Sequence, residues 1–212
     1  MLVKNDYVNK DQVVFVKEDE SLEEVLQTLD KSGYRCIPVL DASGEKFVGN
    51  VYKVHLLEHE LDHALSGSLS DLIKNHDGYI KEMDPFFKVF SSIRELPYLA
   101  VVGEDREFLG ILTNGNVLQV LENAWGVHNG SYSLTIGTIE YAGALTKMLR
   151  VVNKYCNVQS VISLNNNSQY VRRVCIVLPE EVNEALANKI SADLEKNNFT
   201  VTDIEVLKKA RV

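Results

Sequence analysis

The chain has 212 residues, of which 45% are apolar, 8% aromatic and 25% charged. This composition is typical of a soluble globular protein with one or two packed cores, and no apolar run reaches the ~20 residues that a membrane span requires. The formal net charge of −8 argues against binding to nucleic acid, which requires a basic surface. It does not exclude a phosphate-bearing ligand, because a few cations or backbone N–H groups can hold one phosphate.

The start of the chain and the cysteines indicate the compartment. Residues 1–6 lack the basic and then apolar pattern of a signal peptide. Cys36, Cys156 and Cys175 lie in apolar, strand-like runs and are odd in number. We interpret them as buried hydrophobic side chains in a reducing compartment rather than as disulfides or metal ligands. These features predict a cytoplasmic protein.

The first unit of the chain is predicted to contain a strand, a helix, two short strands and a closing helix. Ser21 and Glu24 have the spacing of a capping box, and Gly33 is placed to end the helix that they begin. The other predicted elements are the strands Gln12–Val16, Cys36–Leu40 and Phe47–Gly49, and a helix from Lys53. A short connecting helix is expected over Ser68–Lys74.

The second unit repeats this order. Asp84 and Pro85 are expected to be the N-cap and the first residue of its first helix. The strands Leu99–Val102 and Phe108–Gly110 follow, and then a helix from Thr113 to about Asn123. The segments Gly49-Asn50-Val51-Tyr52 and Gly110-Ile111-Leu112-Thr113 occupy equivalent places, which indicates a repeat. Such duplication predicts two half-sites that face each other across a pseudo-two-fold axis, with a small ligand held in a cleft between them.

The pattern changes after residues 125–130, the glycine-bearing stretch that we interpret as a linker. Beyond it, the predicted strands are 132–136, 158–164, 171–178 and 200–206, and two helices begin near Ala142 and Val182. The order βαββαβ predicts a ferredoxin-like layer of helices on an antiparallel sheet, with an edge strand that can pair with a second copy. The whole chain is therefore expected to be α+β, with units at residues 1–64, 65–126 and 127–212.

These motifs resemble known families. Residues 21–60 and 84–123 resemble a tandem pair of CBS domains, the nucleotide-sensing pair called a Bateman module. Residues 33–41 (GYRCIPVLD) are similar to that family's second strand, and residues 110–116 (GILTNGN) to its Gly-apolar-apolar-Ser/Thr-x-x-Asp signature. Residues 131–207 resemble an ACT domain, in which a small ligand often lies near the first strand–helix turn, here Tyr141–Leu145. Two CBS-like β-α-β-β-α repeats and one ACT-like unit cover nearly the whole chain.

The resemblance implies a set of ligand-binding residues. Thr113 is placed to bond a phosphate at the start of a helix, and Asn116, where the family usually has Asp, keeps an acceptor for a ribose hydroxyl. Arg35 suits a phosphate, and the rings of Tyr34 and Tyr98 could flank a purine. The full predicted set is Tyr34, Arg35, Ile37, Pro38, Tyr98, Gly110, Thr113 and Asn116.

The residues also allow simpler interpretations. Thr113 and Asn116 could only cap a helix, the two tyrosines could be half-buried strand aromatics, and Arg35 could be a solvated surface side chain. Gly143, at the first strand–helix turn of the ACT-like unit, could admit a ligand or serve the turn alone. In the first CBS-like repeat Tyr52 and His55 replace the Ser/Thr and Asp of the signature. One competent nucleotide cleft per pair is therefore expected.

Residues 59–63 (HELDH) match the His-Glu-x-x-His pattern of zinc peptidases, and His55 lies one turn earlier. No third ligand is indicated downstream, and Leu57, Leu61 and Leu65 are expected to form an apolar stripe that leaves the histidines on the polar face. We interpret this helix as exposed or as facing a second copy, with no metal site. No nucleophile elbow, phosphate loop or dinucleotide-binding glycine motif occurs. The sequence therefore favours a protein that is not an enzyme.

The favoured function is a regulatory sensor with no cofactor. Its CBS-like pair is expected to bind an adenine nucleotide, cyclic di-AMP first and AMP, ADP or ATP next. The homodimer is then expected to pass the signal to a separate protein target, with neither nucleic acid nor membrane as a partner. One alternative is an amino-acid-responsive regulator that senses through the ACT-like unit. The other is a zinc hydrolase that uses His59, Glu60 and His63.

Overall fold

The computed structural model describes residue 3 and residues 6–138, 142–165 and 172–207. The chain divides into two compact units, Met1–Leu118 and Gln119–Val212, and the division lies inside helix α4 (Asn114–Trp125). Helices and mainly antiparallel sheets make up both units, as expected for the α+β class. The three-part division with boundaries after residues 64 and 126 stays a prediction. Of the helices in the described part of the chain, none has the length and apolar character needed to cross a membrane.

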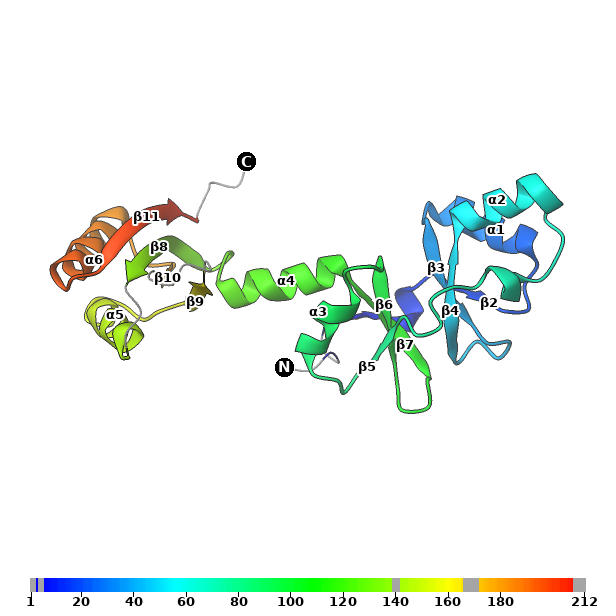
Figure 1. Ribbon diagram of the computed structural model, residues 1–212, viewed down its shortest axis with the longest axis horizontal. Helices are drawn as coiled ribbons and strands as arrows, with labels where there is room; N and C mark the ends of the chain where they lie inside the picture. The colour runs from blue at the N-terminus through cyan, green and yellow to red at the C-terminus, as the bar shows by residue number, and fades with distance from the viewer. Residues whose placement is uncertain (1–2, 4–5, 139–141, 166–171, 208–212) are drawn as a thin grey trace. The chain divides into compact units, whose positions relative to one another are not determined.

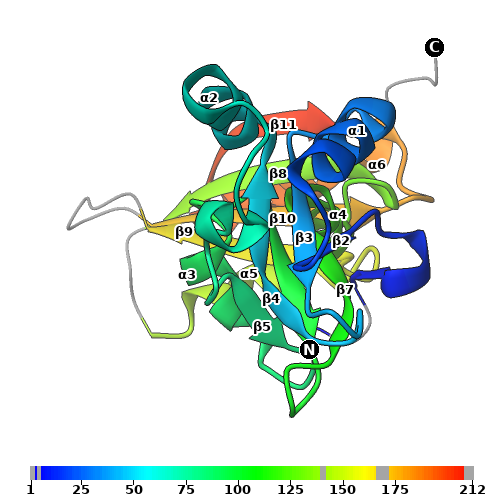
Figure 2. The same ribbon diagram turned by 90° about the vertical axis from the view of Figure 1, so that its right-hand side faces the viewer.

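The first repeat forms a three-stranded sheet in the order β2-β3-β4, with two helices. Its elements are β2 (Val16–Lys17), α1 (Leu22–Ser32), β3 (Cys36–Leu40), β4 (Phe47–Tyr52) and α2 (Lys53–His63). The predicted capping box of Ser21 and Glu24 is confirmed, and Gly33 ends α1 in the left-handed conformation at φ 72°. Figure 2 shows α1 and α2 together beyond one end of β3 and β4.

The second repeat has the same topology. Its elements are β5 (Tyr79–Lys81), the 3-10 turn η4 (Phe86–Lys88), α3 (Val89–Ser92), β6 (Tyr98–Val102), β7 (Phe108–Thr113) and α4. In both repeats the first strand runs parallel to the second, and the second runs antiparallel to the third. The registers also agree, since Cys36 pairs with Tyr52 and Tyr98 with Thr113. Tyr52 and Thr113 are therefore structurally equivalent.

The two repeats meet around a pair of equivalent phenylalanines. The backbone N–H of Phe47 donates to the carbonyl of Arg106 at 3.1 Å, and that of Phe108 donates to the carbonyl of Glu45 at 2.7 Å. The two rings stack on each other with centroids 6.3 Å apart. These reciprocal contacts are those expected at a pseudo-two-fold axis between the repeats.

The recurring glycine of each repeat admits a crossing segment. The short strand β1 (Val8–Asn9) pairs with β7, and a Cβ on Gly110 would collide with the carbonyl of Val8. A Cβ on Gly49 would lie 2.7 Å from the carbonyl of Lys74, whose segment pairs with Asn50. Each glycine is thus required because another stretch of backbone passes against its strand.

One predicted element of the first compact unit is wrong in type, and another is present in a shorter form. Residues 12–16 were expected to form a strand, but Lys10–Gln12 form the 3-10 turn η2, and the strand begins only at Val16. Of the apolar residues between them, Val13 and Phe15 pack against the cluster that contains Phe47 and Phe108 of both repeats, whereas Val14 packs against the core of the first repeat. The short connecting helix predicted over 68–74 is present as the 3-10 helix η3 (Leu69–Leu72), with Ser68 as its N-cap.

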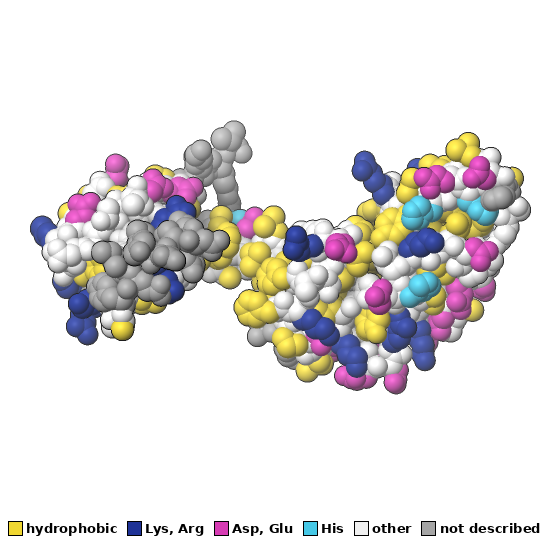
Figure 3. All heavy atoms as spheres, in the orientation of Figure 1, with side chains coloured by type: hydrophobic (Ala, Val, Ile, Leu, Met, Phe, Trp, Pro, Cys, Tyr) yellow, Lys and Arg dark blue, Asp and Glu magenta, His cyan; other side chains and the backbone are white. Residues whose placement is uncertain are grey.

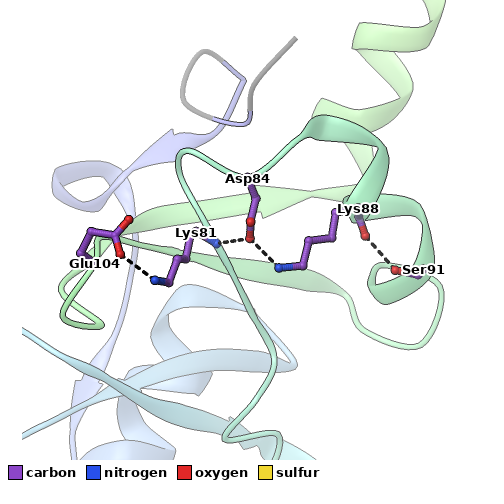
Figure 4. A network of polar contacts seen from close by, with 5 residues as sticks. All are labelled: Lys81, Asp84, Lys88, Ser91 and Glu104. Carbon is purple, nitrogen blue, oxygen red and sulfur yellow. Dashed lines mark hydrogen bonds and ion pairs between the residues drawn. The ribbon is translucent and has the colours of Figure 1, made fainter.

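The predicted N-cap at Asp84 is also wrong, because Pro85 occupies that position and the helix is short. The carboxylate of Asp84 instead accepts a bond from the backbone N–H of Lys81 at 3.1 Å and pairs with Lys88 at 2.8 Å. Figure 4 shows these contacts beside the ion pair of Lys81 and Glu104 and the bond from the Ser91 hydroxyl to the Lys88 carbonyl. Burial acts to raise the pKa of Asp84, but the bond from Lys88, the backbone bond from Lys81 and the charges of these two lysines together lower it.

The apolar stripe predicted on α2 faces the wrong way. Leu57 and Leu61 are 42% and 87% exposed, and of the predicted stripe only Leu65 packs against the core of the first repeat; the leucine that α2 buries there is Leu56. The buried face of α2 is therefore narrower than the sequence pattern indicates.

The second unit has the predicted ferredoxin-like topology. Its elements are β8 (Gly130–Thr138), α5 (Ala144–Val152), β9 (Ser160–Asn165), β10 (Arg172–Pro179), α6 (Glu184–Lys196) and β11 (Thr200–Val206). The strands form one antiparallel sheet in the order β11-β8-β10-β9, and α5 and α6 pack on one face of it (Figure 1). Tyr141 and the polar residues 166–168 lie outside the described residues.

The cysteines are free, as predicted, but each is only partly buried. Cys36 lies in β3 and Cys175 in β10, whereas Cys156 follows α5 and is not in a strand. The interpretation of all three as buried strand residues is therefore wrong in part.

Candidate ligand-binding cleft

A cleft of about 480 Å³ lies within the first compact unit, between the two repeats. Its walls come from three parts of the chain: the segment before β2, the turn and strand that follow α1, and the facing strands β6 and β7 with the residue before β6. The lining residues are Val8, Gln12, Val13, Val14, Gly33, Tyr34, Arg35, Cys36, Ile37, Pro38, Pro97, Tyr98, Ile111 and Thr113. Its size falls within the range of small-molecule sites.

The sequence predicted much of this lining. Tyr34, Arg35, Ile37, Pro38, Tyr98 and Thr113 all border the cleft, whereas Gly110 and Asn116 do not. Gly110 lies under Val8 of the crossing strand β1, and Asn116 lies one helical turn beyond Thr113 in α4. The structure thus brings six of the eight predicted residues together.

The segment before β2 is the part that sequence reasoning missed. Val8, Gln12, Val13 and Val14 line the cleft although none was predicted to do so. Val8 reaches it because β1 pairs with β7 of the other repeat. The available signal was the recurring glycine at position 110, which marks a close approach of backbone.

The cleft is apolar with one charged group. Among the described residues that line it, Arg35 carries the only formal charge, and its side chain is exposed. Tyr34 is 55% exposed, whereas Tyr98 is 5% exposed. This arrangement can hold a flat, apolar group against the aromatic and aliphatic walls and a single anionic group near the guanidinium.

Tyr98 is fixed from behind the cleft. Its hydroxyl donates to Oδ1 of the buried Asn50 at 2.7 Å, and Sγ of Cys36 lies 3.7 Å from the same hydroxyl. Burial raises the pKa of Tyr98 well above its ordinary value, and burial also raises the pKa of the Cys36 thiol. Both groups are therefore neutral at physiological pH, and Tyr98 borders the cleft as an uncharged side chain.

Thr113 and Asn116 form a reciprocal cap at the start of α4. The Thr113 hydroxyl donates to Oδ1 of Asn116 at 2.6 Å and accepts from the Asn116 backbone N–H at 3.2 Å. Oδ1 of Asn116 also accepts from the Thr113 backbone N–H at 3.1 Å. The capping interpretation thus describes the geometry, and Thr113 borders the cleft at the same time.

The equivalent position in the first repeat is occupied differently. The Tyr52 hydroxyl donates to Oδ1 of Asn75 at 2.8 Å, and the Tyr52 ring lies 5.4 Å from the ring of His55. Burial, and to a lesser extent the neighbouring Cys36, raise the pKa of Tyr52 to about 12. The first repeat thus has a tyrosine that is hydrogen-bonded to Asn75 at the position where the second repeat has Thr113, whose small side chain borders the cleft.

The His-Glu-x-x-His segment lies on α2. Nε2 of His59 lies 2.6 Å from the carbonyl oxygen of Ser66, a hydrogen bond that ties the helix to the following turn. Figure 3 shows histidine side chains near α2 among acidic side chains. Within the part of the chain that the structure describes, no group of three or more His, Cys, Asp or Glu side chains is arranged to hold a metal ion.

The second unit has a cavity of its own. It measures about 580 Å³ and lies at the turn between β8 and α5, where Gly143 adopts φ 89° as the N-cap of α5. The lining residues are Thr138, Ala142, Gly143, Ala144, Leu145, Thr146, Ser163, Arg172 and Val174. A Cβ on Gly143 would meet no atom within 4 Å, so the conformation of the turn, not close packing, requires this glycine.

Comparison with known proteins shows which family the first repeat resembles. Residues 3–62 match the family model of the CBS domain. A search of curated proteins finds no match. The first repeat is similar to a CBS domain.

Solved structures extend this similarity. A CBS domain-containing protein of unknown function from Bacillus anthracis is 29% identical with a TM-score of 0.52, over 57% of this chain and 93% of that one. A hypothetical conserved protein from Geobacillus kaustophilus is 26% identical with a TM-score of 0.53, over 57% and 96%. The CbpB protein of Listeria monocytogenes, solved in complex with c-di-AMP, is 24% identical with a TM-score of 0.51, over 57% and 94%. The last likeness shows a shared fold.

Proposed function

We propose that this protein is a non-enzymatic regulatory sensor that binds an adenine nucleotide in the cleft between its two CBS-like repeats. The observation that carries the proposal is the cleft itself, which gathers Tyr34, Arg35, Tyr98 and Thr113 from both repeats around one space. The base would lie against the apolar and aromatic walls, and a phosphate would lie near Arg35 and the start of α4.

Cyclic di-AMP is the favoured ligand, ahead of AMP, ADP and ATP. Each of its phosphodiesters carries one negative charge, which matches the single cation of the lining better than a triphosphate does. It is two-fold symmetric, so one half could occupy this cleft and the other half the same cleft of a second copy. The similarity to the c-di-AMP-bound Listeria protein points the same way. The proposed assembly is a cytoplasmic homodimer that passes the signal to a separate protein.

A thermal-shift screen with cyclic di-AMP, AMP, ATP and cyclic di-GMP tests this function, followed by calorimetry with the ligands that act. A ligand that binds only the folded state raises the melting temperature, and we expect cyclic di-AMP to raise it most. Arg35→Ala should weaken binding about tenfold, or ~1.4 kcal/mol. The matched control is Arg94→Ala, which removes another exposed arginine that does not border the cleft. Equal losses in the two variants, or no response to any adenine nucleotide, would overturn the proposal.

A second candidate function rests on the cavity of the ferredoxin-like unit. That cavity combines Arg172, which suits a carboxylate, with the hydroxyl side chains of Thr138, Thr146 and Ser163. An ACT-like unit that senses an amino acid is therefore the alternative. Calorimetry with amino acids separates it from the first proposal, since Arg172→Ala should abolish an amino-acid signal and leave nucleotide binding intact.

A further inference from the structure

Helix α4 begins at the cleft. Thr113 precedes the first turn of the helix and borders the cleft. Its hydroxyl donates a hydrogen bond to Oδ1 of Asn116 at 2.6 Å. A hydroxyl has one proton to donate. A ligand oxygen that takes this proton therefore removes one bond from the first turn of the helix.

The other end of α4 is fixed to the sheet of the second unit. Gly126 N–H donates to the carbonyl of Asn123 and Val127 N–H to that of Glu122, and Gly126 has φ 73°, which together form a Schellman cap. A Cβ on Gly126 would lie 2.7 Å from Cγ of Gln159. The Ser160 hydroxyl donates to the carbonyl of Trp125 at 2.7 Å. The last turn is thus held closely against the segment that begins β9.

The division between the two compact units falls after Leu118, inside this helix. One element of 12 residues is therefore capped by a cleft residue at its start and by sheet contacts of the other unit at its end. The backbone bonds of a helix form cooperatively, so that each turn supports the next. A change in the stability of the first turn therefore alters the stability of the turns that follow it.

We propose that α4 reports occupancy of the cleft to the ferredoxin-like unit through the Thr113–Asn116 cap. This inference rests on the proposed nucleotide function. The bound ligand takes the Thr113 hydroxyl proton, Asn116 loses its short bond, and the first turn of α4 rearranges. The contacts of Trp125 and Gly126 with the β9 segment then change, so the two units are coupled by differential contacts in the free and bound states.

Trp125 makes this coupling measurable, because it is the only tryptophan of the chain and lies at the end of α4. Its emission, excited where adenine does not absorb, is followed while cyclic di-AMP is added to the full chain. Deuterium exchange at residues 126–130 and 159–163 is followed on the same samples. We expect both to change at saturation, with the same midpoint as binding measured by calorimetry.

A matched pair of variants tests the role of the helix. Gln119 and Asn123 are exposed positions of α4 that do not border the cleft. Gln119→Gly with Asn123→Gly loosens the helix, and Gln119→Ala with Asn123→Ala keeps it strong, since alanine is the best helix former and glycine among the weakest. The glycine pair should bind within twofold of wild type but lose more than half of the emission and exchange changes. Gln119→Gly alone serves if the pair does not melt cooperatively.

The outcomes separate the two proposals. Binding by the wild type without any change at Trp125 or in exchange at the β9 segment overturns the coupling alone. An equal response in the glycine and alanine pairs also overturns it, because the helix would then not be the carrier. No binding by any variant overturns the nucleotide function, and the coupling with it.

Discussion

The two CBS-like repeats have the same backbone fold and differ in the side chain at each half-site. Their strands pair in the same register, with the same irregularity immediately beside the pair that contains the recurring glycine. Yet Tyr52 is bonded to Asn75 in the first repeat, whereas Thr113 borders a cleft in the second. The comparison teaches that the duplicated architecture is maintained by backbone contacts, which leaves the side chains at the half-sites free to diverge.

The recurring glycines are the most sensitive point of that shared backbone. Gly110→Ala would place a Cβ against the carbonyl of Val8 and should destabilise the protein by about 3 kcal/mol or more. Gly49→Ala should act in the same direction. In contrast, Gly115→Ala in the first turn of α4 meets Thr113 at an ordinary 3.5 Å and should stabilise by about 0.5–1 kcal/mol. Urea unfolding measures all three, and a tolerated Gly110→Ala would contradict the crossing of β1.

The buried tyrosine should matter more to stability than its half-exposed neighbour. Tyr98→Phe leaves Oδ1 of the buried Asn50 without its donor and should cost roughly 1–3 kcal/mol. Tyr52→Phe removes a partly buried bond to Asn75 and should cost about 0.5–1.5 kcal/mol. Both are measured by urea unfolding. The reverse order would mean that Tyr52, rather than Tyr98, holds the repeats together.

Ligand binding should depend on the half-site of Thr113 and not on that of Tyr52. Thr113→Ala should weaken cyclic di-AMP binding by about three- to tenfold, or roughly 0.7–1.4 kcal/mol, through the loss of one hydroxyl bond. Thr113→Ser, which keeps the hydroxyl, should bind like wild type. Tyr52→Phe should leave the affinity unchanged if the first half-site is not used. Calorimetry gives these values, and unchanged binding by Thr113→Ala would remove that hydroxyl from the site.

The smallest expected difference between the repeats is in how their stability changes at acidic pH. Backbone N–H groups of Lys46 and Glu45 lower the pKa of Asp41 from 3.8 to about 2, whereas Gly103 holds the corresponding place in the second repeat. Because the folded-state pKa is depressed, Asp41 favours folding above about pH 4, and this contribution is lost as the pH falls toward 2. Asp41→Asn should therefore flatten the fall of the urea midpoint over that range. Parallel pH profiles for the variant and wild type would contradict this role.

The sequence predicted the features that depend on neighbouring residues alone. The side chains of Ser21 and Glu24 determine where α1 begins, the backbone preference of Gly33 determines where it ends, and both predictions are confirmed. The order of the strands followed from the recurrence of Gly49 and Gly110. Of the six predicted cleft residues, all but Tyr98 lie within a few residues of Gly33 or Gly110 in the chain.

The rest depended on distant partners. Residues 13–15 are rich in strand-forming side chains, but they lie between η2 and β2, and Val13 and Phe15 pack against the apolar cluster between the repeats. Asp is a common N-cap residue, yet the carboxylate of Asp84 accepts from the backbone N–H of Lys81 and forms an ion pair with Lys88. The exposure of Leu61 and the presence of Val8 in the cleft likewise arise from tertiary packing, which periodicity along one segment does not contain.

The crossing of β1 over β7 also decides when the cleft can form during synthesis. Val8 pairs with Ile111, so the earliest strand of the chain finds its partner only after about a hundred further residues have been made. A nascent first repeat on the ribosome accordingly lacks one wall of the pocket. The cleft is complete only after the residues up to Thr113 have left the ribosome, so both repeats must be present before the proposed ligand can bind.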